Sequence, residues 1–228
     1  MRRTLLVVVS LAVPLVLIPF NVRLLATAGF LGWEYGRPHF PPAPGFTDAE
    51  RLALAVPSTR FILRDADPTE LARLTHAGRP LYAPEEIAHL VDVQRFVARL
   101  TWLGILAAAA QLLAAADAWR RRGWAGFASA LARGGWWTIG AVVAIGGGMA
   151  AAWPWVFTRF HMLFFAPGTW QFPVESGLIR LFPGQFWYDT AVVLAGLTAV
   201  EALALIALGH RTRRAHPHDV TGHQPYGS

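Results

Sequence analysis

The sequence predicts an all-α membrane protein with four transmembrane helices and a small extracytoplasmic cap. Of its 228 residues, 54% are hydrophobic and only 15% are charged, whereas soluble domains usually carry about a quarter charged residues. Four apolar runs stand out, and each approaches the ~20 residues that a helix needs to cross ~30 Å of hydrocarbon. We therefore expect one compact bundle instead of several domains.

The four runs lie at residues 5–20, 96–116, 136–156 and 191–208. They divide the chain into a first transmembrane helix at 1–23, a cap with the projecting start of the second helix at 24–95, a three-helix remainder of the bundle at 96–210 with an outer aromatic loop at 157–190, and a disordered cytoplasmic tail at 211–228. Runs of small residues at 107–110 and 146–148 suit close helix packing in lipid.

The first run also has the features of a signal peptide. Arg2 and Arg3 precede it, and Ala26-Thr27-Ala28 resembles a cleavage site. The length of the run, and the polar Asn21 and Arg23 that separate it from that site, favour a retained helix.

Arginine sets the orientation of the spans. The loop between the second and third runs, the segment after the fourth run and the N-terminus are rich in arginine, at positions 120–122 and 133, 211, 213 and 214, and 2 and 3 respectively. Such segments stay in the cytoplasm. Both termini should therefore be cytoplasmic, and residues 24–95 and 157–190 should lie outside.

The cap shows local helix signals. Thr47 and Glu50 fit a capping box. Asp67 fits the N-cap of a second short helix, with Pro68 at its first position and Gly78 as its end. The segment 60–63 between them fits either a helix or a strand.

The second span begins well outside the membrane. Pro84, Glu85 and Glu86 open a helix that nothing interrupts before Ala116. Such a helix would be about 50 Å long at 1.5 Å per residue, so its first turns project outward. His89 should then lie roughly 10 Å above the hydrocarbon edge.

His89 has acidic neighbours on its own helix face. Asp92 follows it by three residues and Glu85 precedes it by four, spacings that bring side chains together. A carboxylate beside a histidine can fix its tautomer and raise its basicity. The simpler interpretation is a solvated surface face, with Arg95 directing its charge to the interface.

His161 follows the third span on the same predicted side of the membrane. Many aromatic residues surround it in the sequence, beyond what an interfacial belt requires, and they can line a pocket for acyl chains or glyceryl groups. Arg159 and Arg180 can bind an anion or pair with Glu175. A satisfied interfacial histidine is the simpler interpretation, and Glu201 in the fourth span most simply bonds to Gln111.

Several classes of function are excluded or disfavoured. The chain has no cysteine, which removes disulfides, thiolate nucleophiles and zinc–thiolate sites. The arginines cluster at span ends, not in a stripe, so no nucleic acid partner is expected. We predict no metal and no cofactor.

Two segments resemble the signatures of the lipoprotein intramolecular transacylase (Lit) family. Residues 86–93, EIAHLVDV, are similar to its E-x-x-H-x-x-D-V pattern. The segment 160–165, followed by Gly168-Thr169-Trp170 and then by 178–183 and Phe186-Trp187, is similar to its second signature. The order of four spans and one cap also fits, so the resemblance covers nearly the whole chain.

The resemblance implies an enzyme of the bacterial cytoplasmic membrane. Its substrate would be a diacylglyceryl lipoprotein, whose sn-2 acyl chain moves to the N-terminal cysteine amine. His89 and His161 would share the acid–base work. The residues expected to bind or position substrate are Asp92, Arg95, Arg159, Trp170, Glu175, Arg180 and Trp187. The alternatives are a non-catalytic lipid- or lipoprotein-binding assembly protein, a bis-histidine haem protein and a transporter.

Overall fold

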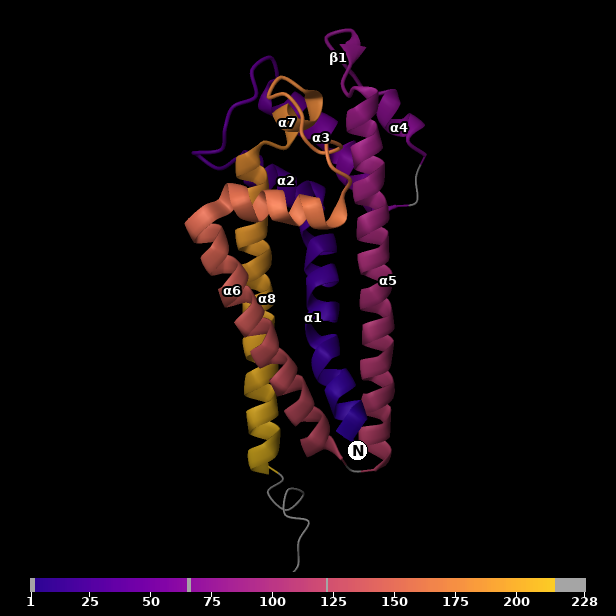
Figure 1. The fold of residues 1–228 in the computed structure, drawn as a ribbon, viewed down its shortest axis with the longest axis vertical. Helices are drawn as coiled ribbons and strands as arrows, with labels where there is room; N and C mark the ends of the chain where they lie inside the picture. Colours follow the sequence, from indigo (N-terminus) through magenta and orange to yellow (C-terminus); the bar gives the residue numbers. More distant parts are fainter. Residues whose placement is uncertain (1–2, 65–66, 122, 216–228) are drawn as a thin grey trace, which may run out of the picture. The chain divides into compact units, whose positions relative to one another are not determined.

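The structure is a computed structural model that describes residues 3–64, 67–121 and 123–215. It confirms an all-α architecture with four helices long and apolar enough to cross a membrane, and the chain is a multi-pass membrane protein. These four are α1 (Arg3–Leu25), α5 (Pro84–Arg120), α6 (Trp124–Phe164) and α8 (Gly184–Ala215). Between them lie α2 (Ala28–Tyr35), α3 (Asp48–Leu63), α4 (Thr69–Ala72), β1 (Thr75–His76), β2 (Arg79–Pro80) and α7 (Gly177–Leu181) (Figure 1).

The chain folds as two compact units, and the long helices contribute to both. The first unit contains Met1–Phe20, Trp102–Gly146 and Ala195–Ser228, and the second contains Asn21–Thr101 and Gly147–Leu194. The first unit therefore holds most of each apolar run. The second holds the short helices, the hairpin and the outer parts of α5, α6 and α8.

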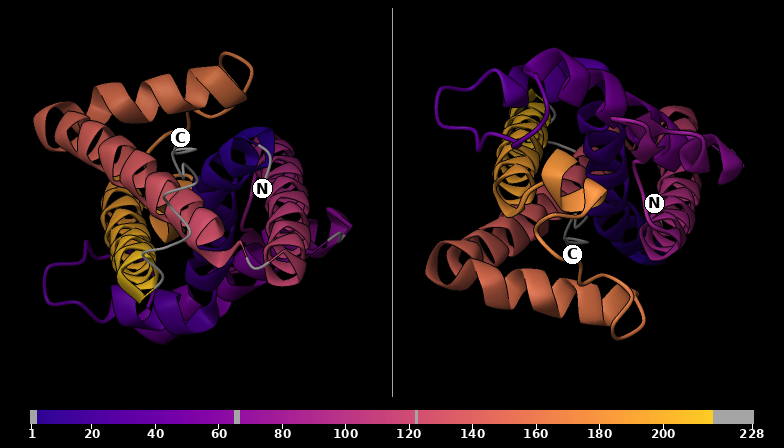
Figure 2. Two further views of the ribbon diagram at one scale, coloured as in Figure 1. Left: turned by 90° about the horizontal axis from the view of Figure 1, so that it is seen from below. Right: turned by 90° about the horizontal axis from the view of Figure 1, so that it is seen from above.

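In the first unit, segments of four helices run lengthwise next to one another (Figures 1 and 2). Ser10 of α1 donates to the carbonyl oxygens of Leu6 and Ala130. A β-carbon at Gly134 would collide with Ser10 and Val13 of α1. One at Gly209 of α8 would collide with α6. Single glycines thus let these helices approach closely.

The small-residue runs that the sequence singles out do not form these contacts. Gly146 and Gly147 face open space. Gln111 donates to the carbonyl oxygen of Val9 at 3.3 Å, a partner on α1 that the expected pairing with Glu201 does not include. Packing partners in lipid depend on which helix face meets which neighbour, and local composition does not specify that.

The second unit has its own hydrophobic core. Its largest fully buried side chains include Leu31, Phe61, Leu71 and Leu181, from α2, α3, α4 and α7. Leu90 of α5 belongs to the same cluster. The outer end of α5 is therefore embedded in a folded domain, which fixes the orientation of its side chains.

The capping-box prediction is confirmed. The Thr47 side chain accepts from the backbone N–H of Glu50, and the Glu50 carboxylate accepts from the N–H of Thr47. The ambiguous segment 60–63 is the end of α3. The next helix differs from its prediction, because α4 begins at Thr69 and Pro68 is its N-cap. Asp67 still accepts from the Thr69 N–H at 2.8 Å.

The prediction that Gly78 ends this helix is wrong. Helix α4 ends at Ala72, and Gly78 lies in the two-residue turn between β1 and β2. Both turn residues have positive φ, 49° at Ala77 and 74° at Gly78. A two-residue hairpin turn requires such angles, so the glycine serves the hairpin instead of the helix.

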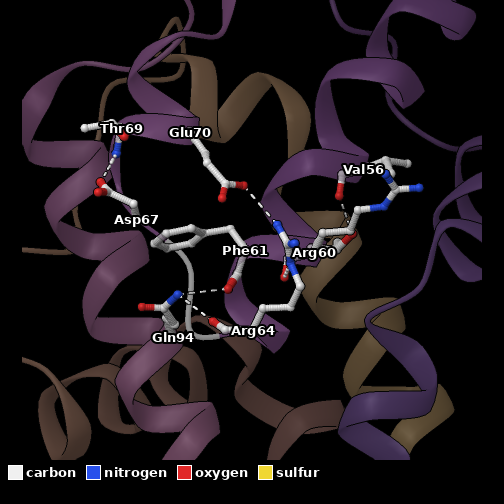
Figure 3. Close-up of polar contacts among 9 residues, drawn as sticks. Val56, Arg60, Phe61, Arg64, Asp67, Thr69, Glu70 and Gln94 are labelled. Carbon is white, nitrogen blue, oxygen red and sulfur yellow. Dashed lines mark hydrogen bonds and ion pairs between the residues drawn. The ribbon is translucent and has the colours of Figure 1, made fainter.

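Helix α5 is joined to the end of α3 by one side chain. The Gln94 amide donates to the carbonyl oxygens of Phe61 and Arg64, at 3.0 and 2.7 Å (Figure 3). Both carbonyls belong to the last turn and C-cap of α3, where backbone acceptors lack helical partners. The Arg64 side chain pairs with Glu70 of α4, so this contact links three helices just below His89.

A charged cluster joins α2 to α8. Arg37 lies 3.2 Å from a carboxylate oxygen of Glu34 and 3.0 Å from one of Asp189. Glu34 is fully buried, and burial together with a hydrogen bond to Asp189 raises its pKa to about 7. At neutral pH the two carboxyl groups therefore tend to share a proton.

Two segment boundaries also differ from expectation. Helix α6 does not end near Val156 but continues to Phe164, with a break at Ala152, where φ is −156° and ψ is 59°. The expected outer loop at 157–190 therefore contains helical residues at both ends and α7 between them. Helix α8 continues to Ala215, past the expected start of the tail at 211, and residues 216–228 lie outside the described residues.

Candidate functional site

Two histidines from distant parts of the chain meet in the second unit. His89 lies on the second turn of α5, and His161 lies near the end of α6. Their ring centroids are 6.2 Å apart, and the rings are inclined by 30°. A substrate group placed between the ring edges would be within reach of both, which is the arrangement that paired acid–base catalysis needs.

The tautomer of His161 follows from its hydrogen bond. Its Nδ1 lies 2.8 Å from the carbonyl oxygen of Phe157. A carbonyl can only accept, so Nδ1 carries the proton and donates. In the neutral ring Nε2 then keeps its lone pair. His161 is therefore oriented by its own helix and offers one basic nitrogen.

His89 is more enclosed than its place on a projecting helix suggests. It is only 7% exposed, and its Nδ1 is buried without a hydrogen-bond partner. Burial, and secondarily the neighbouring His161, lowers the pKa of His89 to about 4. Burial also lowers the pKa of His161, opposed by its bond to Phe157. Both rings, which lie outside the apolar segments 96–116 and 136–156, are thus neutral at pH 7.

Aromatic side chains enclose the pair. Phe165 and Phe172 lie against His89, with ring centroids at 5.1 and 5.6 Å. Phe157 and Trp170 lie against His161, at 4.1 and 4.7 Å. The Trp170 indole N–H is buried and has no partner. The site is therefore an apolar enclosure that contains unpartnered polar atoms of both His89 and Trp170.

A buried carboxylate connects the two parts of the chain that form this enclosure. Glu86, one turn before His89, is 3% exposed. It accepts from the backbone N–H of Ala83 at 2.7 Å and from that of Leu178, at the start of α7, at 2.6 Å. Gly177 allows this approach, because a β-carbon there would collide with the carbonyl of Leu81. Glu86 thus fixes the α7 region, and the loop before it, against the start of α5.

Of the predicted positioning residues, Trp170 contacts a histidine directly and Asp92 lies close by on the helix of His89. The carboxylate of Asp92 pairs with Arg95 at 3.4 Å, and both are exposed. The printed partners of His89 are aromatic, so the expected carboxylate hydrogen bond to its Nδ1 is absent. Burial, not a carboxylate partner, is the largest influence on this imidazole.

The other predicted residues have different contacts. Arg180 donates to the carbonyl oxygen of Pro44 and lies 4.2 Å over the Phe46 ring. Trp187 donates to the carbonyl oxygen of Phe182 at 3.2 Å. Arg159 lies 5.4 Å over the Trp155 ring, and Glu175 is exposed. Their described partners therefore anchor the second unit or its surface, not the histidine pair.

The residues that sequence reasoning missed are Glu86 and the two phenylalanines beside His89. The glutamate stands inside the quoted E-x-x-H segment, where it reads equally well as a first-turn acid of a helix. Phe165 and Phe172 are two of many aromatic residues in their region. In the described parts of the chain, no three histidine or acidic side chains gather so that they could hold a metal ion.

Comparisons with known proteins agree with this architecture. The family described as "Lipoprotein intramolecular transacylase Lit" matches residues 7–187. An uncharacterized protein of Aquifex aeolicus is 26% identical over 221 residues, covering 92% of this chain and 94% of that protein.

The fold is also shared with a solved structure. The membrane integral lipoprotein intramolecular transacylase Lit from Bacillus cereus has a TM-score of 0.79 at 16% identity, covering 93% of this chain and 97% of that one. A histidine-substituted form of the same protein gives a TM-score of 0.75 at 14% identity, covering 95% and 94%. The family match spans most of the chain and both histidines, and the chain therefore belongs to the lipoprotein intramolecular transacylase (Lit) family.

Proposed function

We propose that this protein moves an acyl chain from the sn-2 glyceryl ester of a diacylglyceryl lipoprotein to the amine of the N-terminal cysteine. The observation that carries the proposal is the pair His89 and His161, 6.2 Å apart within an aromatic enclosure, in a chain of the Lit family. The product is an N-acyl, S-monoacylglyceryl lipoprotein.

The reaction needs one proton removed and one supplied. The amine nitrogen attacks the ester carbonyl carbon and a C–N bond forms, while a histidine accepts the N–H proton. The C–O bond to glycerol then breaks, and the departing oxygen receives a proton from a histidine. Acceptor and donor belong to one substrate, so the enzyme's main contribution is to hold amine and ester together.

The unpartnered atoms of the enclosure suit this chemistry. A buried polar group without a partner costs about 1–3 kcal/mol, a cost that substrate hydrogen bonds can remove. The Trp170 N–H can donate to the ester carbonyl oxygen, and His89 Nδ1 can exchange a proton with the reacting groups. Both atoms are closed to solvent, so substrate binding requires the aromatic side chains over them to move.

The location of the site follows from arginine. The loop between α5 and α6 and the end of α8 carry Arg120, Arg121, Arg133 and Arg211, which favours a cytoplasmic position for both. The second unit, with residues 24–95 as its cap, would then lie on the outer face of the bacterial cytoplasmic membrane. Diacylglyceryl lipoproteins carry their N-terminal cysteine at that face.

Mass spectrometry of a lipoprotein tests the proposal. The N-terminal peptide is compared between cells with and without this protein. We expect conversion from a diacylglyceryl peptide with a free amine to an isomer of equal mass, whose fragmentation places one acyl chain on nitrogen. An unchanged fragmentation pattern in cells that contain the folded protein would contradict the proposed activity.

The pH dependence should report the lowered histidine pKa values. An α-amino group has a pKa near 8, so its loss of a proton makes the rate rise about tenfold per pH unit below that value. A histidine with an ordinary pKa near 6.5 would add a second factor of ten per unit at lower pH. Because His89 stays neutral down to about pH 4, a plot of log rate against pH should keep a slope of one between about pH 5 and 7. A change to a slope of two near pH 6.5 would refute a neutral, buried base.

A further inference from the structure

The last twelve residues of α6 have an outer face that nothing in the second unit covers. The break at Ala152 separates residues 153–164 from the earlier part of the helix. In Figure 1 this segment lies across the outer parts of α5 and α8 instead of running along them. One of its faces packs inward, where Trp153 contacts Tyr188 and His161 contacts His89.

The outer face carries Trp155, Arg159, Met162 and Leu163, which share one side of the helix at spacings of four, seven and eight residues. Leu163 is 74% exposed, Trp155 61% and Met162 55%. Exposed apolar area costs about 25 cal/mol per Å² in water, so a contiguous face of this kind indicates an apolar partner.

The chemistry of the face indicates which partner. Helix α6 is continuous with an apolar run that crosses the membrane, so lipid already surrounds its earlier part. The guanidinium of Arg159 lies 5.4 Å over the Trp155 ring. Tryptophan and arginine with a long apolar stem are the side chains that settle where acyl chains meet headgroups. A guanidinium also pairs well with phosphate oxygens.

We propose that residues 153–164 lie in the plane of the membrane interface, with Trp155, Met162 and Leu163 among the outer acyl chains of phospholipids and Arg159 at their phosphates. The segment is thus not part of the transmembrane span. Its inner face holds His161 level with the headgroup–acyl boundary. This placement does not depend on the proposed activity and can be measured without substrate.

The absence of cysteine makes a direct depth measurement possible. Trp155→Cys, Met162→Cys and Leu163→Cys each receive one nitroxide label in the full chain, reconstituted in vesicles of phosphatidylcholine and phosphatidylglycerol. Collision with oxygen and with a water-soluble nickel chelate gives the depth of each label. Ala49→Cys, exposed on α3, is the aqueous control. Leu112→Cys, exposed within the apolar part of α5, is the lipid control.

An in-plane helix and a spanning helix give different results. We expect the labels at positions 155 and 163 to lie at equal depth, just inside the headgroups and shallower than the label at 112. In a helix that continues the span, eight residues would separate them by about 12 Å. A difference of that size would overturn the proposal. Nickel accessibility of the 162 and 163 labels equal to that at position 49 would overturn it as well.

Discussion

Replacing either histidine of the pair with alanine should lower the rate of acyl migration by at least about 100-fold, the range in which positioned general acids and bases contribute. His89→Ala removes the more buried ring and His161→Ala the ring that Phe157 orients. The measurement is the rate of conversion of a purified diacylglyceryl lipopeptide by each variant in detergent micelles. Conversion within a few-fold of the natural protein in both variants would remove the histidines from the mechanism.

Two further variants separate chemistry from structure. His161→Asn can still donate an N–H to the Phe157 carbonyl but lacks the free nitrogen at the Nε2 position, so it should be as inactive as His161→Ala. His39→Ala changes an exposed histidine of the second unit and should leave the rate unchanged. Full activity of His161→Asn would show that the ring serves only as a structural donor.

Removing the buried carboxylate of Glu86 should destabilise the protein and lower its activity together. Glu86→Ala leaves the backbone N–H groups of Ala83 and Leu178 buried without acceptors. Hydrogen bonds to charged groups contribute about 1.5–3 kcal/mol each, and we expect a loss of about 3 kcal/mol in the free energy of unfolding. Conversion should also slow, because the enclosure loses its attachment to the start of α5.

The matched controls for this prediction lie on the same turn. Glu85→Ala removes an exposed first-turn acid and should cost less than about 1 kcal/mol, the usual size of a helix-dipole effect. Glu86→Gln keeps one acceptor oxygen and should fall between the natural protein and Glu86→Ala. Thermal unfolding in micelles, followed by circular dichroism, measures all three. Equal unfolding midpoints for Glu85→Ala and Glu86→Ala would contradict the role of Glu86.

Part of the fold could be read from local sequence. The apolar runs are long enough to require helices in lipid, because backbone groups there must be satisfied within the segment. The capping box at Thr47 and the start of α5 at Pro84 depend on a few adjacent residues, and both are confirmed. The family resemblance, carried by the segments around His89 and His161, is also confirmed.

Other features depend on which residues meet across the chain. Whether Asp92 bonds to His89 depends on Arg95 and on the aromatic side chains that the loop before α7 brings to the ring. The place where α6 turns is not set by the extent of its apolar run, because the run continues through the break at Ala152. Gly78 fits a helix end and a hairpin turn equally well by sequence, and both require positive φ.

The sequence by itself determined the four apolar helices, the family and the identity of the two histidines, because each rests on residues close together in the chain. Only the tertiary structure decided that the rings of His89 and His161 lie 6.2 Å apart, that burial lowers their pKa values and that Glu86 holds the enclosure together. These properties come from atoms more than seventy residues apart in the chain, and no local pattern specifies which of them come into contact.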